Sequence, residues 1–104
     1  MSAVHVLAVI TCRAGMRPRV LELFKQNVPK VHAEKGCIEY EATVDLGNFG
    51  AFQAPMGPDT FVVIEKWANA DALRAHAVAP HMKDYGAKTK DFIANRKVHV
   101  LTKA

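Results

Sequence analysis

The sequence predicts an α+β fold in which strands and helical segments follow the order β-α-β-β-α-β, with a four-stranded antiparallel sheet. Short segments rich in β-branched and aromatic residues alternate along the chain with longer segments whose apolar residues recur every three or four positions. The chain has 104 residues, half of them hydrophobic, which suits one domain with a modest core. We therefore expect a single domain over residues 1–104 with the ferredoxin-like arrangement, in which both helical segments cover one face of the sheet.

The first strand is predicted over residues 4–10, and both of its faces are apolar. Val4, Val6, Ala8 and Ile10 alternate there with His5, Leu7 and Val9. A helix is predicted over residues 17–35, where Val20, Leu21, Phe24, Val28 and Val31 form one apolar side. Pro18 suits its first turn, Pro29 should kink it, and Gly36 is placed to end it.

The second strand is predicted over residues 37–45, at an edge of the sheet. Ile38, Tyr40, Ala42 and Val44 alternate with Glu39, Glu41 and Thr43. Residues 46–59 contain three glycines and two prolines and are predicted to form a loop longer than a tight hairpin. Its apolar residues Phe49, Phe52 and Met56 could fold over a pocket, contact a partner subunit or pack within the loop.

The third strand is predicted over residues 61–67, and its alternation directs Phe61, Val63, Glu65 and Trp67 to one face. Asn69 or Asp71 can then cap a helix on which Leu73, His76 and Ala77 share one side. Pro80 interrupts that helix. A last helix is predicted over residues 81–93, with Met82, Tyr85, Thr89 and Phe92 on one side, and a fourth strand over residues 96–102.

Composition and motifs argue against several classes of function. The net charge of +4 is spread along the chain without an aromatic-interleaved basic motif, so we expect no nucleic-acid partner. No apolar run approaches the length of a membrane helix, and we expect a cytoplasmic protein with free thiols at Cys12 and Cys37. His76 and His81 are five residues apart across a proline, and His5 and His99 are only two ligands, so we expect no metal.

The candidate site follows from Glu65, because a carboxylate within an apolar strand must be paired, protonated or at an opening. Glu65 is either bonded to a basic side chain or backbone amides, or it orients His76 as an acid–base group. Trp67 is either a core residue or a pocket wall. Tyr40, Tyr85 and His81 have the same two interpretations, as core residues or as ligand contacts.

These residues also carry a resemblance to a known family. The strand ending Glu65-Lys66-Trp67, the later His76, the Pro80-His81 pair and the strand Gly36-Cys37-Ile38-Glu39-Tyr40 resemble the antibiotic biosynthesis monooxygenase family, whose members are small dimeric α+β barrels. The resemblance implies a cofactor-independent monooxygenase that deprotonates a phenolic, quinol or polyketide-type aromatic, which then reacts directly with molecular oxygen. It implies His76 as the base and Trp67 as the ring-stacking wall, and we expect Glu65 to assist His76. We expect the substrate to contact Phe24, Tyr40, His81 and Tyr85.

Three alternatives remain open at this stage. A ligand-binding or stress-associated dimer without turnover would use the same pocket. A haem-degrading branch of the same fold also has a Trp and a His at comparable places, but it adds an Asn on the first strand, which reads Val4-His5-Val6-Leu7-Ala8-Val9-Ile10 here. A third branch isomerises small sugar-like molecules through polar pocket residues that do not map onto this chain.

A homodimer follows from the strands themselves. The helices cover one face of the sheet and leave apolar side chains uncovered on the other face. These are Leu7 and Val9, Val62 and Ile64, and one apolar set of the fourth strand. Soluble monomers rarely expose an apolar patch of that kind. We therefore expect two sheets to meet face to face across a two-fold axis, and the resemblance implies the same dimeric barrel.

Overall fold

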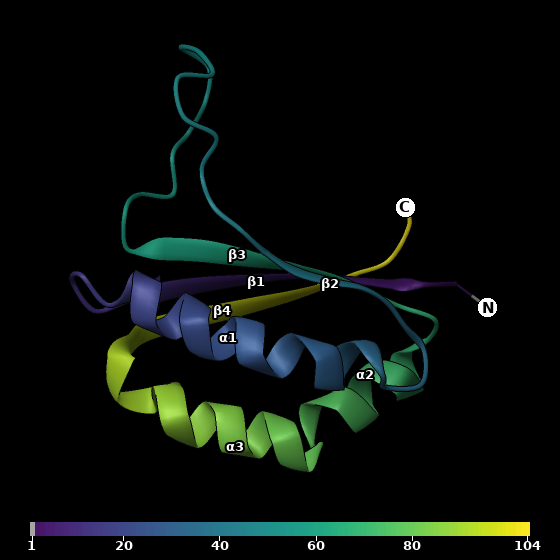
Figure 1. Ribbon diagram of the computed structural model, residues 1–104. Helices are drawn as coiled ribbons and strands as arrows, with labels where there is room; N and C mark the ends of the chain where they lie inside the picture. The colour runs from purple at the N-terminus through teal and green to yellow at the C-terminus, as the bar shows by residue number, and fades with distance from the viewer. Residues whose placement is uncertain (1) are drawn as a thin grey trace.

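The computed structural model describes residues 2–104 and forms a sheet with helices on one face (Figure 1). Along the chain its elements are β1 (Val4–Cys12), α1 (Arg17–His32), β2 (Cys37–Thr43), β3 (Thr60–Trp67), α2 (Ala70–Ala77), α3 (Pro80–Thr89), the short 3-10 helix η1 (Lys90–Phe92) and β4 (Ile93–Leu101). Within residues 2–104, none of these helices has the length and apolar character needed to span a bilayer.

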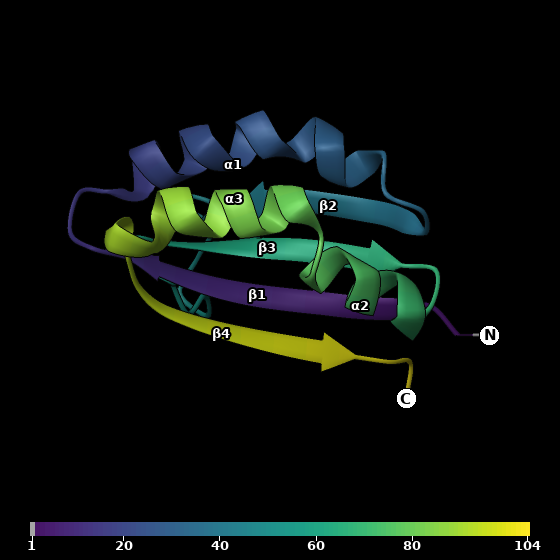
Figure 2. The same ribbon diagram turned by 90° about the horizontal axis from the view of Figure 1, so that it is seen from below.

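The four strands lie in the order β2-β3-β1-β4, and every neighbouring pair is antiparallel. This is the predicted ferredoxin-like arrangement, which is confirmed, with β2 at one edge as expected. Figure 2 views the sheet from the helix side, where α1 runs along β2, α3 lies over β3, and no helix covers β4. The side of the molecule toward β4 is therefore the open side of the helix layer.

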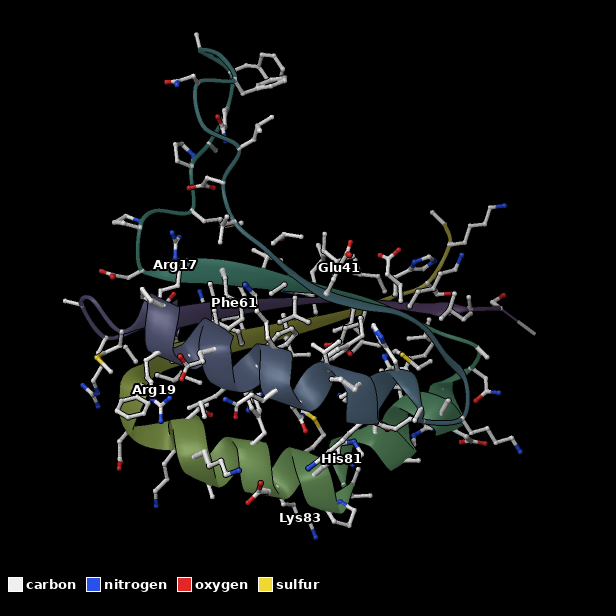
Figure 3. All side chains as sticks on the ribbon, in the orientation of Figure 1. Arg17, Arg19, Glu41, Phe61, His81 and Lys83 are labelled. Atoms are coloured by element: carbon white, nitrogen blue, oxygen red, sulfur yellow. The ribbon has the colours of Figure 1, made fainter. Side chains whose placement is uncertain are left out.

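The core lies between the helices and the inner face of β1 and β3, as the alternation predicted. Its strand residues are Val6, Ala8, Ile10 and Cys12 from β1 and Phe61, Val63, Glu65 and Trp67 from β3, all of which are buried. Figure 3 shows Phe61 on the helix side and Glu41 on the opposite, open face of the sheet. Placing Glu65 and Trp67 on the buried face positions a carboxylate and an indole beneath α2.

The first helix ends earlier than predicted, at His32 instead of Lys35. The backbone N–H of Glu34 donates to Val31 O, and that of Cys37 donates to Glu34 O, so residues 33–36 form a separate turn. Gly36 has φ of 86°, a left-handed conformation that glycine adopts most easily. This turn carries a side chain that proves central to the site.

The last helix and the last strand also have corrected boundaries. The helix predicted to reach Ile93 ends at Thr89, and Ile93 already begins β4, where it pairs with Cys12. The backbone N–H of Arg13 donates to Phe92 O at 2.8 Å, which draws this segment onto the end of β1. Strand pairing therefore takes Ile93 out of the predicted helix, while residues 90–92 form the 3-10 helix η1 that follows α3.

β2 departs from simple alternation at its start. The register with β3 shifts between Cys37 and Glu39, and Ile38 is 57% exposed although the alternation placed it in the core with Tyr40. Tyr40, which pairs with Glu65, is buried as predicted. Cys37 and Cys12 are free thiols, as expected, and burial raises the pKa of both.

The apolar residues of β4 divide between the two faces of the sheet. Val98 pairs with Ala8 and Val100 with Val6, so both valines belong to the helix side of the sheet, yet they are 50% and 58% exposed because no helix reaches over β4. The open face of β4 carries Asn95, Lys97, His99 and Leu101. The leftover apolar set on the open face is therefore Leu7, Val9, Val62 and Ile64, with Leu101 as the contribution of β4.

The loop between β2 and β3 rises from the sheet on the side opposite the helices (Figure 1). Asp45 closes its base by accepting from the backbone N–H groups of Met56 and Gly57, each at 2.9 Å, and these bonds lower the pKa of the Asp45 carboxyl. Phe49 and Phe52 contact each other edge to face with ring centroids 5.1 Å apart, and Phe52 is 85% exposed. The loop therefore does not cover a pocket beneath the helices.

Candidate functional site

A cavity of about 450 Å³ lies between the helix side of the sheet and helices α2 and α3. Ligand pockets of roughly 300–1,000 Å³ hold small organic molecules. The strands contribute Val6, Ala8, Ile10 and Val63 to its floor, and the helices contribute Leu73, Met82, Tyr85 and Gly86. Most of the lining is apolar, so the few polar side chains that reach the cavity decide its chemistry.

Three aromatic rings form one side of the cavity. Phe24 of α1 stacks on Tyr40 with centroids 5.1 Å apart and planes 15° from parallel. Tyr85 meets Phe24 edge to face at 6.1 Å. Burial raises the pKa of both tyrosines, to about 12 for Tyr85. Both phenols therefore stay protonated at neutral pH and can donate a hydrogen bond to a planar ligand.

His76 stands at the polar end of the cavity. Asn69 caps α2 by accepting from the backbone N–H of Ala72 at 2.8 Å, and His76 lies on the inner side of that helix, 5% exposed. Its Nδ1 is 2.9 Å from Glu34 Oε2, while its Nε2 lies 3.9 Å from Glu65 Oε1. The ring is thus held on its Nδ1 side, and its Nε2 side is the one without a close hydrogen bond.

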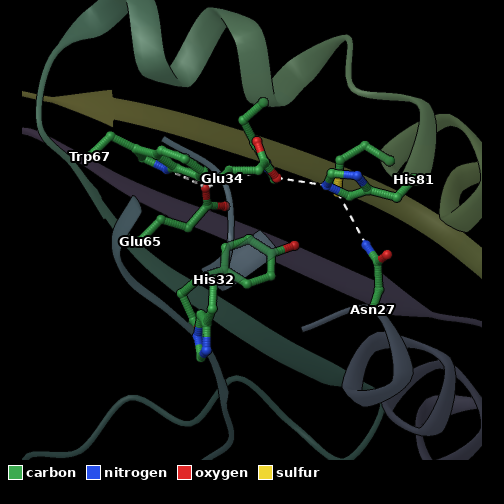
Figure 4. Close-up of polar contacts among 9 residues, drawn as sticks. Asn27, His32, Glu34, Glu65, Trp67 and His81 are labelled. Atoms are coloured by element: carbon green, nitrogen blue, oxygen red, sulfur yellow. Dashed lines mark hydrogen bonds and ion pairs between the residues drawn. The ribbon is translucent and has the colours of Figure 1, made fainter. Parts of the chain in front are cut away.

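Glu34 is a functional residue that the sequence reasoning missed. Its Oε2 lies 2.9 Å from His76 Nδ1 and also contacts His81 Nε2, at 2.7 Å. Figure 4 shows Glu34 directed at His81. A carboxylate only accepts hydrogen bonds, so each imidazole donates an N–H to that oxygen when Glu34 is ionised. Glu34 therefore fixes the proton of neutral His76 on Nδ1 and leaves a lone pair on Nε2.

Tertiary packing brings Glu34 to this place. A Cβ at Gly36 would lie 2.6 Å from the Cβ of Ala72, so the turn at residues 33–36 packs directly on α2. Ala68 N donates to Gly36 O at 2.8 Å and fixes the turn to the end of β3. The only sequence signal was a glycine two residues after a glutamate in a charged segment, which local pattern cannot connect to His76.

Glu65 is buried at 7% exposure and accepts a hydrogen bond from Trp67 Nε1 at 2.9 Å. Burial raises the pKa of the Glu65 carboxyl, while the Trp67 N–H and the charges of His76 and Arg96 oppose that rise. The sequence interpretation made Glu65 the partner that orients His76. In the structure Glu34 has the hydrogen-bonding contact, and Glu65 faces the other nitrogen from 3.9 Å.

Trp67 and His81 lie outside the lining of the cavity. Trp67 is fully buried and its ring centroid is 4.6 Å from that of His76, so it forms a layer behind the histidine and not a surface for a ligand. The aromatic rings that line the cavity are instead Phe24, Tyr40 and Tyr85. His81 reaches the site only through Glu34, so a direct contact with a substrate does not fit its position.

The structure thus brings Phe24, Tyr40, Glu65, His76 and Tyr85 together around one cavity. Arg96 of β4 and Lys90 are exposed side chains that also line the cavity, a position to which the sequence analysis assigned no role. Among residues 2–104 there is no cluster of three or more His, Cys, Asp or Glu side chains arranged to hold a metal ion. The arrangement can take up a proton at His76 Nε2 from a ligand held against aromatic rings.

Comparison with known proteins identifies related chains. Residues 3–88 match the family model described as antibiotic biosynthesis monooxygenase. A curated protein of Escherichia coli K12, named probable quinol monooxygenase YgiN, is 38% identical over 98 residues, which cover 92% of this chain and 93% of that protein.

Solved structures show the same fold. Protein PA3566 from Pseudomonas aeruginosa superposes with a TM-score of 0.82 at 21% identity, covering 100% of this chain and 96% of the other. Rv0793 from Mycobacterium tuberculosis gives 0.80 at 23% identity, covering 99% and 96%. At these identities the likeness concerns the fold.

Proposed function

Because the chain belongs to the antibiotic biosynthesis monooxygenase family, we propose that it oxygenates a phenolic or quinol-type aromatic with molecular oxygen and without a bound cofactor. The observation that carries this proposal is His76, held by Glu34 at Nδ1, with Nε2 available at the polar end of an aromatic-lined cavity. The name of the 38% identical relative supports a quinol as the substrate class.

The substrate ring lies against Phe24 and Tyr40, with a hydroxyl directed at His76. An offset-stacked ring contacts such a pair favourably, by about 0.5–1.5 kcal/mol beyond the area that it buries. The Phe24–Tyr40 stack therefore orients the plane of the substrate. It also leaves the Tyr40 and Tyr85 hydroxyls to donate to a ring oxygen.

His76 Nε2 accepts the proton of the substrate hydroxyl. The imidazolium that forms lies between two carboxyl groups, with Glu34 Oε2 at 2.9 Å from Nδ1 and Glu65 Oε1 at 3.9 Å from Nε2. An opposite charge within about 4–6 Å favours the charged form of a histidine, so ionised Glu34 stabilises the product of proton transfer. A positioned general base contributes about 10²–10⁴-fold to a rate.

The deprotonated aromatic then supplies the electrons for oxygen. For a quinol, one oxygen atom of O₂ forms a new C–O bond, the ring carbon loses its hydrogen, and the second oxygen atom leaves as water. The products are a hydroxyquinone and water, so the four electrons that reduce O₂ come from the quinol ring. The chain's own residues hold the ring, take its proton and limit access of water.

Oxygen uptake with a panel of hydroquinones and naphthols tests this function. The parent protein should consume oxygen with at least one quinol, and His76→Gln should lower the rate by roughly 10²–10⁴-fold, because the amide cannot take up the proton. His32→Gln is the matched control, since it removes an imidazole at the end of α1, outside the cavity lining. Uptake by His76→Gln at the parent rate would remove His76 as the base. Binding of naphthols without any uptake would favour the non-catalytic alternative.

A further inference from the structure

The cavity has opposite charges at its two ends. Glu65 and His76 line one end, beside Val6 of β1, which pairs with Glu65. Arg96 lines the other end and pairs with Ile10, four residues further along β1. Four residues of a strand span roughly 13 Å, so the positions at which Glu65 and Arg96 pair with β1 are separated along that strand by more than the width of one ring.

Arg96 and the neighbouring Lys90 have no anionic partner of their own. Neither side chain forms an ion pair or a side-chain hydrogen bond within the part of the chain that the structure describes, residues 2–104. Both side chains are exposed, as are other lysines without such a contact, Lys83 and Lys97 among them, but Arg96 and Lys90 also line the cavity. Two unpaired cations therefore share one end of a cavity whose other end holds carboxyl groups.

The guanidinium of Arg96 acts on the interior of the cavity and not only on solvent. Burial raises the pKa of the Tyr85 phenol to about 12, and the charge of Arg96 opposes that rise. Arg96 belongs to β4, which no helix covers (Figure 2), and its side chain is exposed. A planar guanidinium binds a carboxylate through two parallel N–H···O bonds, which suits it to hold an acidic substituent in a fixed orientation.

We propose that the substrate is a hydroxylated aromatic that carries a carboxylate on the side of the ring system remote from the reacting hydroxyl, and that Arg96, assisted by Lys90, binds this carboxylate. The hydroxyl end of this assignment rests on the proposed function of His76. A fused two-ring compound spans the cavity better than a single ring, because its hydroxyl and its carboxylate then reach opposite ends. Glu65 and Glu34 disfavour the reverse orientation by repelling the carboxylate.

Equilibrium binding of two matched probes tests the proposal without turnover. The probes are 2-naphthol and 6-hydroxy-2-naphthoate, which differ only in a carboxylate opposite the hydroxyl. The parent protein should bind the naphthoate roughly 10- to 100-fold more tightly, the range expected for hydrogen bonds to a charged group. Arg96→Gln should remove most of that preference, and Lys90→Gln should reduce it less. Added salt should weaken the preference in the parent.

Lys97→Gln is the matched control, because it removes one positive charge from the same strand on its opposite face. Equal affinity of the two probes for the parent, or a preference that survives Arg96→Gln, would overturn the proposal. The binding assay separates the two claims of function. A preference that depends on Arg96 in a protein that never consumes oxygen would leave the carboxylate site standing and defeat the monooxygenase. Oxygen uptake with neutral quinols and no preference between the probes would support the monooxygenase and defeat the carboxylate site.

Discussion

At the scale of single residues, the site consists of buried polar groups whose partners decide what they can do. Glu34 orients His76 by a hydrogen bond, whereas Glu65 is engaged by the indole of Trp67. The alternation of β3 predicted correctly that Glu65 and Trp67 share a buried face. It could not predict which carboxylate would reach His76, because Glu34 belongs to a turn that only tertiary packing brings against α2.

The raised pKa of Glu65 makes a prediction for stability. Its carboxyl has a pKa above the ordinary 4.5 in the folded protein, chiefly because burial disfavours the charge. The folded state therefore binds this proton more tightly than the unfolded state. Below pH 4.5 both states are protonated and no penalty arises, but the penalty grows as pH rises from 4.5 through the folded pKa.

Glu65→Gln should remove that penalty and still accept the Trp67 N–H bond. The free energy of unfolding of the variant, relative to the parent, should therefore increase between pH 4 and pH 8 in urea unfolding experiments. Glu22→Gln, at an exposed position of α1, should show no comparable trend. A difference for Glu65→Gln that stays constant or falls with rising pH would show that burial does not govern this carboxyl.

At the scale of elements, hydrophobic periodicity predicted the order of the helices and strands and the faces that they bury. Where each element ends is set by contacts with segments distant in sequence. Ile93 was assigned to the last helix by its spacing, yet it pairs with Cys12 in the sheet. The Gly36 turn shows the same principle, since its contact with Ala72 is invisible in the local pattern. Boundaries and turns depend on neighbours distant in sequence, whereas element type depends on the segment itself.

Gly36→Ala should therefore destabilise the protein by about 2 kcal/mol or more, because it combines a left-handed backbone with a Cβ that meets Ala72 at 2.6 Å. Gly15→Ala is the matched control, with φ of 77° and nothing within 4 Å, and should cost only about 1 kcal/mol. Chemical denaturation of both variants measures the difference. Equal losses would mean that the contact between the turn and α2 contributes nothing. Gly36→Ala should also lower oxygen uptake, because it displaces Glu34 from His76.

At the scale of the whole molecule, the helices protect only one side of the sheet. Leu7, Val9, Val62, Ile64 and Leu101 share the uncovered face, and the loop bearing Phe49 and Phe52 rises from that same side (Figure 1). We propose that a second copy of this chain covers this face, sheet against sheet. The sequence predicted that apolar residues of the two central strands would face away from the helices. It did not predict that Val98 and Val100 would lie on the helix side of β4, where no helix covers them.

Sedimentation at low micromolar concentration measures the assembly. A protein of 11.4 kDa that dimerises through this face should sediment at about twice that mass. Leu7→Lys together with Ile64→Lys should shift it to the monomer, because two charges placed opposite each other on paired strands cannot be buried together. Parent protein that sediments as a single species of 11.4 kDa would contradict the dimer.

Isotope labelling shows whether molecular oxygen reacts with a quinol that His76 has deprotonated in the cavity. Purified parent protein and His76→Gln are each supplied with a dihydroxynaphthalene under ¹⁸O₂, and the ¹⁸O content of the products is measured by mass spectrometry. One ¹⁸O atom should appear in the hydroxyquinone from the parent and the other in water, and the variant should form roughly 10²–10⁴-fold less labelled product. A quinone without label, or equal labelled product from both proteins, would contradict this reaction.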